Sequence, residues 1–118
     1  MPWKYKPSPK YGNSKVTIDG RTFDSKLEAK RYGELALMER AGLIFGLQCQ
    51  VSFELIPTFK KNGKTWRKME YIADFTYRSA LGEFVIEDTK GVRTEAYKLK
   101  RKLFEYKYPD FTIKEIDR

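Results

Sequence analysis

The most informative segment of the chain is MEYIADFTYRSALGEFVIEDTKG, residues 69–91. It contains two runs rich in aromatic and β-branched residues, Met69–Arg78 and Glu83–Thr89, separated by the turn residues 79–82. Two such runs with a short turn between them predict a pair of antiparallel β-strands. Gly91 then interrupts the pattern, which predicts the end of the second strand. The segment therefore predicts the central hairpin of a β-sheet.

The register of this hairpin is predicted to bring two acidic residues together. With the turn centred near Leu81, Asp74 lies directly opposite Asp88, and Ile72 lies opposite Lys90. Side chains alternate between the two faces of a strand, so Lys90 shares a face with Asp88. Asp74 likewise shares a face with Ile72 on the first strand. The parity of the two strands thus predicts that the polar groups converge on one side of the sheet.

The segments on either side of this hairpin predict two helices and further strands. Ser25 and Glu28 have the spacing of a capping box, Thr94 is a favourable helix N-cap, and Asn62-Gly63 favours a two-residue hairpin turn. The expected elements in chain order are a hairpin over 15–23, a helix from Ser25 to about Ala41, a strand over 47–55, a hairpin over 58–68, the two strands described above, a helix from Thr94 to about Tyr106 and a strand over 111–116. The expected fold class is α/β (α+β), with a central mixed β-sheet flanked by two helices.

Each helix is expected to bury one side. In the first helix, Leu27, Leu35 and Met38 mark the buried side. Glu28 lies on the same side as Leu35, so its carboxylate is expected to point towards the sheet. In the second helix, the residues expected to face inward are Ala96, Leu99 and Leu103, and those expected to face outward are Lys98, Arg101 and Lys102.

Composition limits the chemistry that is available to this chain. There is no histidine and only one cysteine, Cys49. These counts exclude histidine triads, histidine general bases, an internal disulfide and cysteine-based zinc sites. Catalysis must therefore depend on carboxylates, lysine, tyrosine or a hard cation. The net charge of +8 and a pI near 9.5 indicate a polyanionic partner such as a nucleic acid.

The length of 118 residues predicts one domain, expected over residues 15–118. Residues 1–14, MPWKYKPSPKYGNS, combine prolines and lysines with no acidic residue, which predicts a flexible basic arm. Aromatic residues alternate with the lysines and suit contacts with bases or phosphates, although a tail with little function is the alternative. No apolar run is long enough for a membrane helix, so we expect a cytoplasmic protein without a membrane partner.

The predicted pairing of Asp74 with Asp88 points to a metal ion. Two carboxylates facing each other repel unless a positive charge neutralises them, and their apolar neighbours limit access of water. With oxygen ligands and no histidine, Mg²⁺ or Mn²⁺ is favoured over zinc. Glu28 is expected to provide a third carboxylate, and the backbone carbonyl of Thr89 a further oxygen. Such a centre suits hydrolysis of a phosphodiester, with Lys90 orienting water or stabilising the developing charge.

Each of these residues also has a simpler interpretation. Glu28 is explained by the capping box alone, and Asp88 with Lys90 by a surface ion pair that contributes little. Glu87 lies next to Asp88 but has the opposite parity, so we assign it to the other face of the strand. The combination of a helix Glu, a strand Asp and an Asp-x-Lys-Gly segment is nevertheless more specific than any of its parts.

The order of these residues resembles that of the PD-(D/E)XK, or restriction-endonuclease-like, nuclease superfamily. Its pattern is matched by Glu28, Asp74 and the segment 88–90, with Ala73 in place of the proline of that superfamily. More closely, the chain is similar to a family of short phage and prophage proteins with a domain of unknown function. The similar segments are KYGNSKVTIDGRTFDSKLEAKRY, YIADFTY, VIEDTKG and YKLKRKLFEYKYPD. The resemblance implies a phage DNA-processing enzyme, namely a Mg²⁺- or Mn²⁺-dependent endonuclease of the host-cell cytoplasm.

The resemblance also implies roles for residues around the acidic group. Gln48 or Gln50 is expected near the metal as an accessory residue, and Lys98 and Arg101 are expected to bind phosphates. Further phosphate contacts are expected from the arm and from Lys60, Lys61, Lys64, Arg67, Lys68 and Lys102. Such contacts position duplex or branched DNA without reading its sequence, so we expect selectivity for structure or strand.

Other functions fit the same residues. Archaeal Holliday-junction resolvases of this superfamily have a similar size and layout of acidic residues and act as dimers, so a homodimeric resolvase in DNA recombination is one alternative. A non-catalytic DNA-binding accessory protein on a decayed nuclease fold is another, although the complete acidic set and Lys90 argue against it. A basic protein without any nucleic-acid role is the third, and the salt dependence of DNA binding tests it.

Overall fold

The computed structural model describes residues 15–18, 20–90 and 93–117. Its elements are β1 (Val16–Ile18), β2 (Arg21–Phe23), α1 (Lys26–Arg40), β3 (Ile44–Ile56), β4 (Phe59–Lys61), β5 (Lys64–Trp66), β6 (Met69–Ser79), β7 (Phe84–Thr89), α2 (Glu95–Lys107) and β8 (Ile113–Ile116). The arm predicted over residues 1–14 lies outside these ranges. Within them, no helix has both the length and the apolar character needed to cross a membrane.

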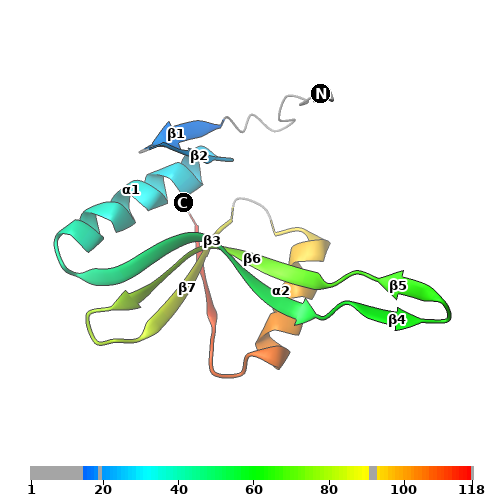
Figure 1. Ribbon diagram of the computed structural model, residues 1–118. Helices are drawn as coiled ribbons and strands as arrows, with labels where there is room; N and C mark the ends of the chain where they lie inside the picture. The colour runs from blue at the N-terminus through cyan, green and yellow to red at the C-terminus, as the bar shows by residue number, and fades with distance from the viewer. Residues whose placement is uncertain (1–14, 19, 91–92, 118) are drawn as a thin grey trace.

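The central sheet has four strands in the order β3-β6-β7-β8 (Figure 1). β6 pairs antiparallel with both β3 and β7, whereas β8 runs parallel to β7. A parallel pair requires a crossover, and α2 provides it. Val85 packs with the cluster around α1, and its neighbour Ile86 packs with the cluster around α2, so the two helices cover opposite faces of β7. The predicted α+β fold, a mixed sheet flanked by two helices, is confirmed.

The register between β6 and β7 is the predicted one. Phe75 pairs with Glu87 and Thr76 with Ile86. Continuing this ladder by one residue places Asp74 opposite Asp88. The predicted acidic pair therefore lies on the two inner strands of the sheet, at the point where their ladder ends.

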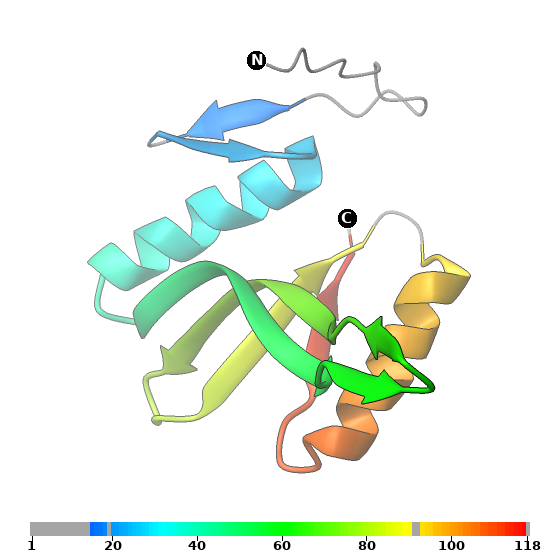
Figure 2. The ribbon, with the colours of Figure 1, turned by 45° about the vertical axis from the view of Figure 1, so that its right-hand side comes forward.

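The core is divided into two clusters along β6. Phe75 and Tyr77 pack in the cluster around α1, whereas Tyr71 and Ala73 pack in the cluster around α2. All four residues have odd numbers and would share one face of a flat strand. Between Ala73 and Phe75, however, this face passes from the cluster around α2 to the cluster around α1. β3 and β6 are strongly twisted and curved along their length, as Figure 2 shows, which accounts for this change.

Asp74 lies at this change of neighbours. The side chain of Ile72 is 51% exposed, whereas Thr76 is buried. The sequence predicted one shared face for Ile72, Asp74 and Thr76, and the twist of the strand divides that face into two environments. Asp74 is therefore half-buried at the boundary between the two core clusters.

The helices begin where their capping residues predict, but the buried side of α2 differs from the prediction. Leu35 in α1 is buried as predicted, together with Glu28. In α2 the buried residues are Tyr97 and Phe104, whereas Leu99 is 55% exposed. Predicting Ala96, Leu99 and Leu103 as the inward side was wrong for Ala96 and Leu99, which are exposed, and Leu103 is only partly buried. The aromatic rings remove more apolar surface from water, so they determine which side is buried.

The β4–β5 hairpin is a separate two-stranded sheet that extends away from the central one (Figures 1 and 2). Its turn residues Asn62 and Gly63 have φ angles of 53° and 71°. Positive φ at both positions is the requirement of the type I′ turn that Asn-Gly sequences favour. The hairpin predicted over 58–68 is thus confirmed.

Candidate active site

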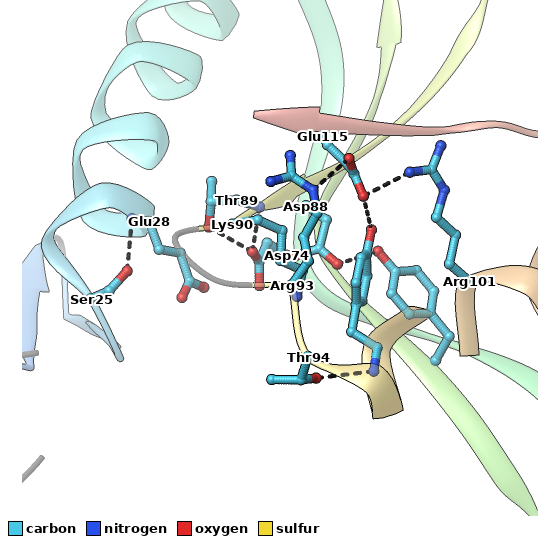
Figure 3. Close-up of polar contacts among 12 residues, drawn as sticks. Ser25, Glu28, Asp74, Asp88, Thr89, Lys90, Arg93, Thr94, Arg101 and Glu115 are labelled. Carbon is cyan, nitrogen blue, oxygen red and sulfur yellow. Dashed lines mark hydrogen bonds and ion pairs between the residues drawn. The ribbon is translucent and has the colours of Figure 1, made fainter. Parts of the chain in front are cut away.

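Glu28 is positioned by the first turn of α1. The backbone N–H of Glu28 donates to Oγ of Ser25 over 3.1 Å, and this capping contact fixes where the helix begins. The Glu28 side chain is only 7% exposed. It projects from α1 towards the space beside Asp74 (Figure 3). Its carboxylate therefore faces the end of the β6–β7 ladder rather than solvent.

Gln50 on β3 connects two of the acidic residues. Its Nε2 donates to Oε2 of Glu28 over 2.9 Å and to Oδ1 of Asp74 over 3.4 Å. The backbone of Gln50 has a φ of 54°, which is unfavourable for a residue other than glycine. Gln48, the alternative accessory residue, lies two residues earlier on β3 and pairs with Thr76. The structure therefore brings Gln50, and not Gln48, to the carboxylates.

Asp74 is held by the strand beside it. Its Oδ2 accepts hydrogen bonds from the backbone N–H of Thr89 at 2.8 Å and from the Thr89 hydroxyl at 2.7 Å. These bonds continue the contact between β6 and β7 beyond the last pair of the ladder. Thr89 thus orients Asp74, whereas the use of the Thr89 carbonyl as a metal ligand stays a prediction.

Asp88 and Lys90 form the other half of the site. Asp88 is 2% exposed, and its Oδ2 accepts a hydrogen bond from the Tyr71 hydroxyl at 2.6 Å. Its Oδ1 lies 3.2 Å from Nζ of Lys90. The same Nζ lies 4.0 Å from the centre of the Tyr97 ring, which is a cation–π contact. Lys90 is therefore not the solvated surface partner that a simple ion pair would require.

The carboxylates are crowded enough to affect each other's protonation. Burial, followed by the negative charge of Asp74, raises the pKa of Glu28 to about 7. Burial also raises the pKa of Asp88 to about 6, and the charge of Asp74 adds to this rise, whereas the hydrogen bond from Tyr71 opposes it. A nearby cation would favour the charged forms of both groups. The electrostatics of the site thus favour a positively charged ligand.

The carboxylate oxygens of the site are the type of ligand that a hard cation prefers. Glu28, Asp74 and Asp88 offer oxygen ligands, which Mg²⁺ and Mn²⁺ prefer. Across the residues that the structure describes, however, no three acidic side chains are close enough to hold an ion in their present positions. The Gln50 amide instead donates to both Glu28 and Asp74. Binding a metal would therefore require the carboxylates to close around the ion.

Glu87 is not part of this site. It is completely buried, and Arg31 of α1 donates to its two carboxylate oxygens at 2.7 Å each. The hydroxyl of Tyr77 also donates to it. The opposite parity of Glu87 and Asp88, expected from the sequence, agrees with these contacts. Glu87 anchors α1 to the face of β7 that points away from α2.

Two residues that contact the candidate site, Tyr71 and Tyr97, were not predicted from the sequence. Tyr71 holds Asp88, and Tyr97 covers Lys90 while donating to Oε2 of Glu115 at 2.7 Å. Both tyrosines are buried. A tyrosine in an apolar pattern carries a hydroxyl that needs a partner when it is buried. That rule identifies such residues as candidates, but only the fold identifies their partners.

The predicted phosphate-binding residues fall into two groups. Lys60, Lys61, Lys64, Arg67 and Lys68 are exposed on or beside the β4–β5 hairpin, and Lys98 and Lys102 are exposed on α2. Arg101 was predicted to face outward. It lies on the same side of α2 as Tyr97 and Phe104, is half-buried, and donates to Glu115 at 2.7 Å. The expected outward orientation of Arg101 was therefore wrong, and its guanidinium is engaged within the protein.

A hollow of about 300 Å³ lies beside the second half of the site. Asp88, Lys90, Tyr97 and Lys100 are among the residues that line it. Lys100 was not among the residues predicted to bind phosphates. It adds a positive charge to a surface that already contains the amine of Lys90. The hollow is thus suited to an anionic group placed next to Asp88.

A protein-family model whose description is "Protein of unknown function (DUF1064)" matches residues 8–118. The chain matches no curated protein and no solved structure.

Proposed function

The chain belongs to the family described as "Protein of unknown function (DUF1064)", and we propose that it is a metal-dependent DNA endonuclease. The proposed reaction is hydrolysis of a phosphodiester bond with Mg²⁺ or Mn²⁺. The proposed site has the residue order of the PD-(D/E)XK superfamily, which the sequence resembles. Its residues are Glu28, Asp74, Asp88 and Lys90.

One observation carries this proposal. Glu28 of α1 and Asp74 of β6 bind the same Gln50 amide, and Asp88 of β7, across the ladder from Asp74, lies 3.2 Å from the Lys90 amine. These residues are far apart in the chain, and the Ser25 cap uses the backbone N–H of Glu28 and not its carboxylate. The Lys90 amine compensates Asp88, whereas among the described residues Glu28 and Asp74 form no ion pair. Buried carboxylates without a compensating charge are unfavourable. Their accumulation at one point therefore supports a functional role.

The residues of the site have separable roles in the proposed reaction. A bound dication would polarise the phosphate and lower the pKa of an attacking water. Glu28, Asp74 and Asp88 would hold this ion, with Asp74 already oriented by Thr89. The Lys90 amine would stabilise the negative charge that develops on the phosphate. Tyr97 and Asp88 keep this amine in place.

The hollow beside Asp88 supports the same assignment for the substrate. A phosphate entering it would meet the amines of Lys90 and Lys100. The net charge of +8 would add a general attraction for DNA. None of these contacts reads a base edge, so we propose selection by DNA structure or strand rather than by sequence.

The test is cleavage of DNA by matched pairs of variants. Asp74→Asn and Lys90→Ala are expected to reduce Mg²⁺- or Mn²⁺-dependent nicking of a supercoiled plasmid about 100-fold or more. Affinity for DNA, measured in EDTA, should change little. The controls are the exposed residues Asp110 and Lys114, as Asp110→Asn and Lys114→Ala, which should retain cleavage. Plasmid nicking by Asp74→Asn at the rate of the wild-type protein would contradict the proposal.

A further inference from the structure

The β4–β5 hairpin exposes a pair of stacked aromatic rings. Phe59 and Trp66 face each other across the hairpin, with ring centroids 6.1 Å apart and an interplanar angle of 9°. Each side chain is 44% exposed, and neither belongs to a cluster of the core. The pair stabilises its own short hairpin. It also leaves flat apolar surface in contact with water at the base of the hairpin, at the pair farthest from the Asn62-Gly63 turn.

The same hairpin carries a concentrated positive charge. Residues 57–68, PTFKKNGKTWRK, contain five basic residues and no acidic residue. Among the residues described, Lys68 forms an ion pair with Glu70 at 3.5 Å, and the other basic residues of the hairpin form none. Nζ of Lys64 lies 4.2 Å from the centre of the Trp66 ring. Exposed rings and unpaired cations thus occupy one surface.

This combination fits a nucleic acid whose bases are accessible. Phosphates alone would require only the lysines, because an aromatic face makes no favourable contact with an anion. A base offers a flat face for stacking, but in a duplex both of its faces are covered by neighbouring base pairs. Unpaired bases are therefore the part of DNA that these rings can bind.

We propose that the β4–β5 hairpin binds unpaired bases of DNA by stacking on Phe59 and Trp66, while its lysines contact the adjoining phosphates. This inference rests on the proposed nuclease function and specifies its substrate as DNA that contains unpaired bases. The hairpin holds the unpaired strand and the acidic site cuts nearby.

The length of chain between the hairpin and Asp74 limits the distance between the bound bases and the cleaved phosphodiester. Met69 begins β6, and Asp74 follows five residues later, which is about 17 Å along a strand. Trp66 lies eight residues before Asp74, so the two are separated by at most about 26 Å along the chain. DNA of B form advances about 3.4 Å per base pair. In DNA with a duplex next to the unpaired bases, cleavage is therefore expected within about eight base pairs of them.

The first experiment measures stacking without cleavage. In a Trp3→Phe/Asp74→Asn background, Trp66 is the remaining tryptophan. We expect single-stranded oligothymidylate in EDTA to quench Trp66 fluorescence, and a blunt duplex with the same number of phosphates to quench it much less. In fluorescence anisotropy, Phe59→Ala/Trp66→Ala should weaken binding of oligothymidylate at least about fivefold while duplex affinity changes little.

Three further variants separate stacking from charge and from folding. Trp66→Phe retains an aromatic ring and should retain most of the affinity for oligothymidylate. Lys60→Ala/Lys61→Ala should weaken binding of both DNAs and flatten the salt dependence without removing the preference. Phe45→Ala removes an aromatic ring that is 52% exposed at the opposite end of β3, and it should have no effect on the preference.

The outcomes distinguish this inference from the nuclease proposal. Equal quenching by both DNAs, or an unchanged preference in Phe59→Ala/Trp66→Ala with melting behaviour like that of wild type, would overturn the inference alone. Plasmid cleavage by the single Asp74→Asn variant would overturn the nuclease proposal, while the binding measurements would remain informative. Absence of binding to either DNA would overturn both.

Discussion

At the scale of single residues, the neighbouring acidic residues Glu87 and Asp88 are both buried but have different partners. Asp88 is bound by Tyr71 and faces the hollow, whereas Glu87 is bound by Arg31 on the opposite face of β7. Alternation along a strand is enough to separate two adjacent carboxylates by the thickness of the sheet. Each then acquires the environment of a different helix.

Substitution of Glu87 should affect stability more than cleavage. Glu87→Gln removes the charge that compensates Arg31, whose side chain is only 17% exposed. We expect the free energy of unfolding to fall by about 2–4 kcal/mol in denaturant titrations. The matched control is Glu34→Gln, because Glu34 pairs with the same arginine at 3.0 Å but is 47% exposed. This control should lose less than about 1 kcal/mol.

Cleavage per folded molecule should change no more than a few-fold in Glu87→Gln, since Glu87 lies on the face away from Lys90. A loss of cleavage as large as that of Asp74→Asn, in protein shown to be folded by circular dichroism, would place Glu87 in the active site. That result would also mean that Glu87, and not Asp88, faces the reacting phosphate.

At the scale of elements, α2 completes the site by placing an aromatic ring over the lysine. Thr94 caps the helix by accepting from the backbone N–H of Tyr97 at 3.1 Å. The hydroxyl of Tyr97 is tied to Glu115 on β8. Through Tyr97, the start of α2 thereby connects Lys90 at the end of β7 with β8.

Tyr97 is proposed as a positioning residue, and two substitutions separate its ring from its hydroxyl. Tyr97→Phe retains the ring over Lys90 and should keep kcat for DNA cleavage within about threefold of wild type. Tyr97→Leu removes the ring and should lower kcat about tenfold, with a smaller change in KM. An equal loss of kcat in both variants would mean that the Glu115 contact, and not the ring, holds Lys90 in position.

At the scale of the whole molecule, the proposed site lies where both helices meet the sheet. Glu28 comes from α1, and Lys90 is covered by α2 on the other side. The β4–β5 hairpin continues the strand that carries Asp74 (Figure 2). Ion binding at such a junction should therefore stabilise the whole fold rather than one segment.

Addition of Mg²⁺ or Mn²⁺ should raise the thermal stability of the protein. At a metal concentration about 100 times the Kd, binding to the folded state alone contributes about 2.7 kcal/mol. We expect Tm to rise by several degrees in calorimetry at matched ionic strength. Asp74→Asn should abolish most of this rise and Asp110→Asn should not. A rise of the same size in Asp74→Asn would show that the ion binds elsewhere.

Much of the fold could be predicted from local pattern. The caps Ser25 and Thr94, the Asn62-Gly63 turn and the register around Leu81 depend on interactions between residues close in the chain. Such interactions are similar in any fold that contains the segment. The position of Asp74 opposite Asp88 belongs to the same class, because the turn determines the register of a hairpin.

Predictions that failed or were incomplete concern contacts between distant elements. Leu99 was predicted inward because leucine is apolar, but Tyr97 and Phe104 occupy that side of α2. The engagement of Arg101 by Glu115 follows from the same rotation of the helix. A helical pattern alone does not decide which of two apolar sides is buried, since the decision depends on the shape and area of the surface opposite.

The amino-acid sequence by itself determined the elements, their order, the strand pairing of the central hairpin and the candidate set Glu28, Asp74, Asp88 and Lys90. Only the tertiary structure decided that Gln50 donates to both Glu28 and Asp74, and that Tyr71 and Tyr97 hold the other half of the site. The physical reason is that turns, caps and alternation act over a few residues. The environment of a buried charge is instead made by whichever elements pack around it.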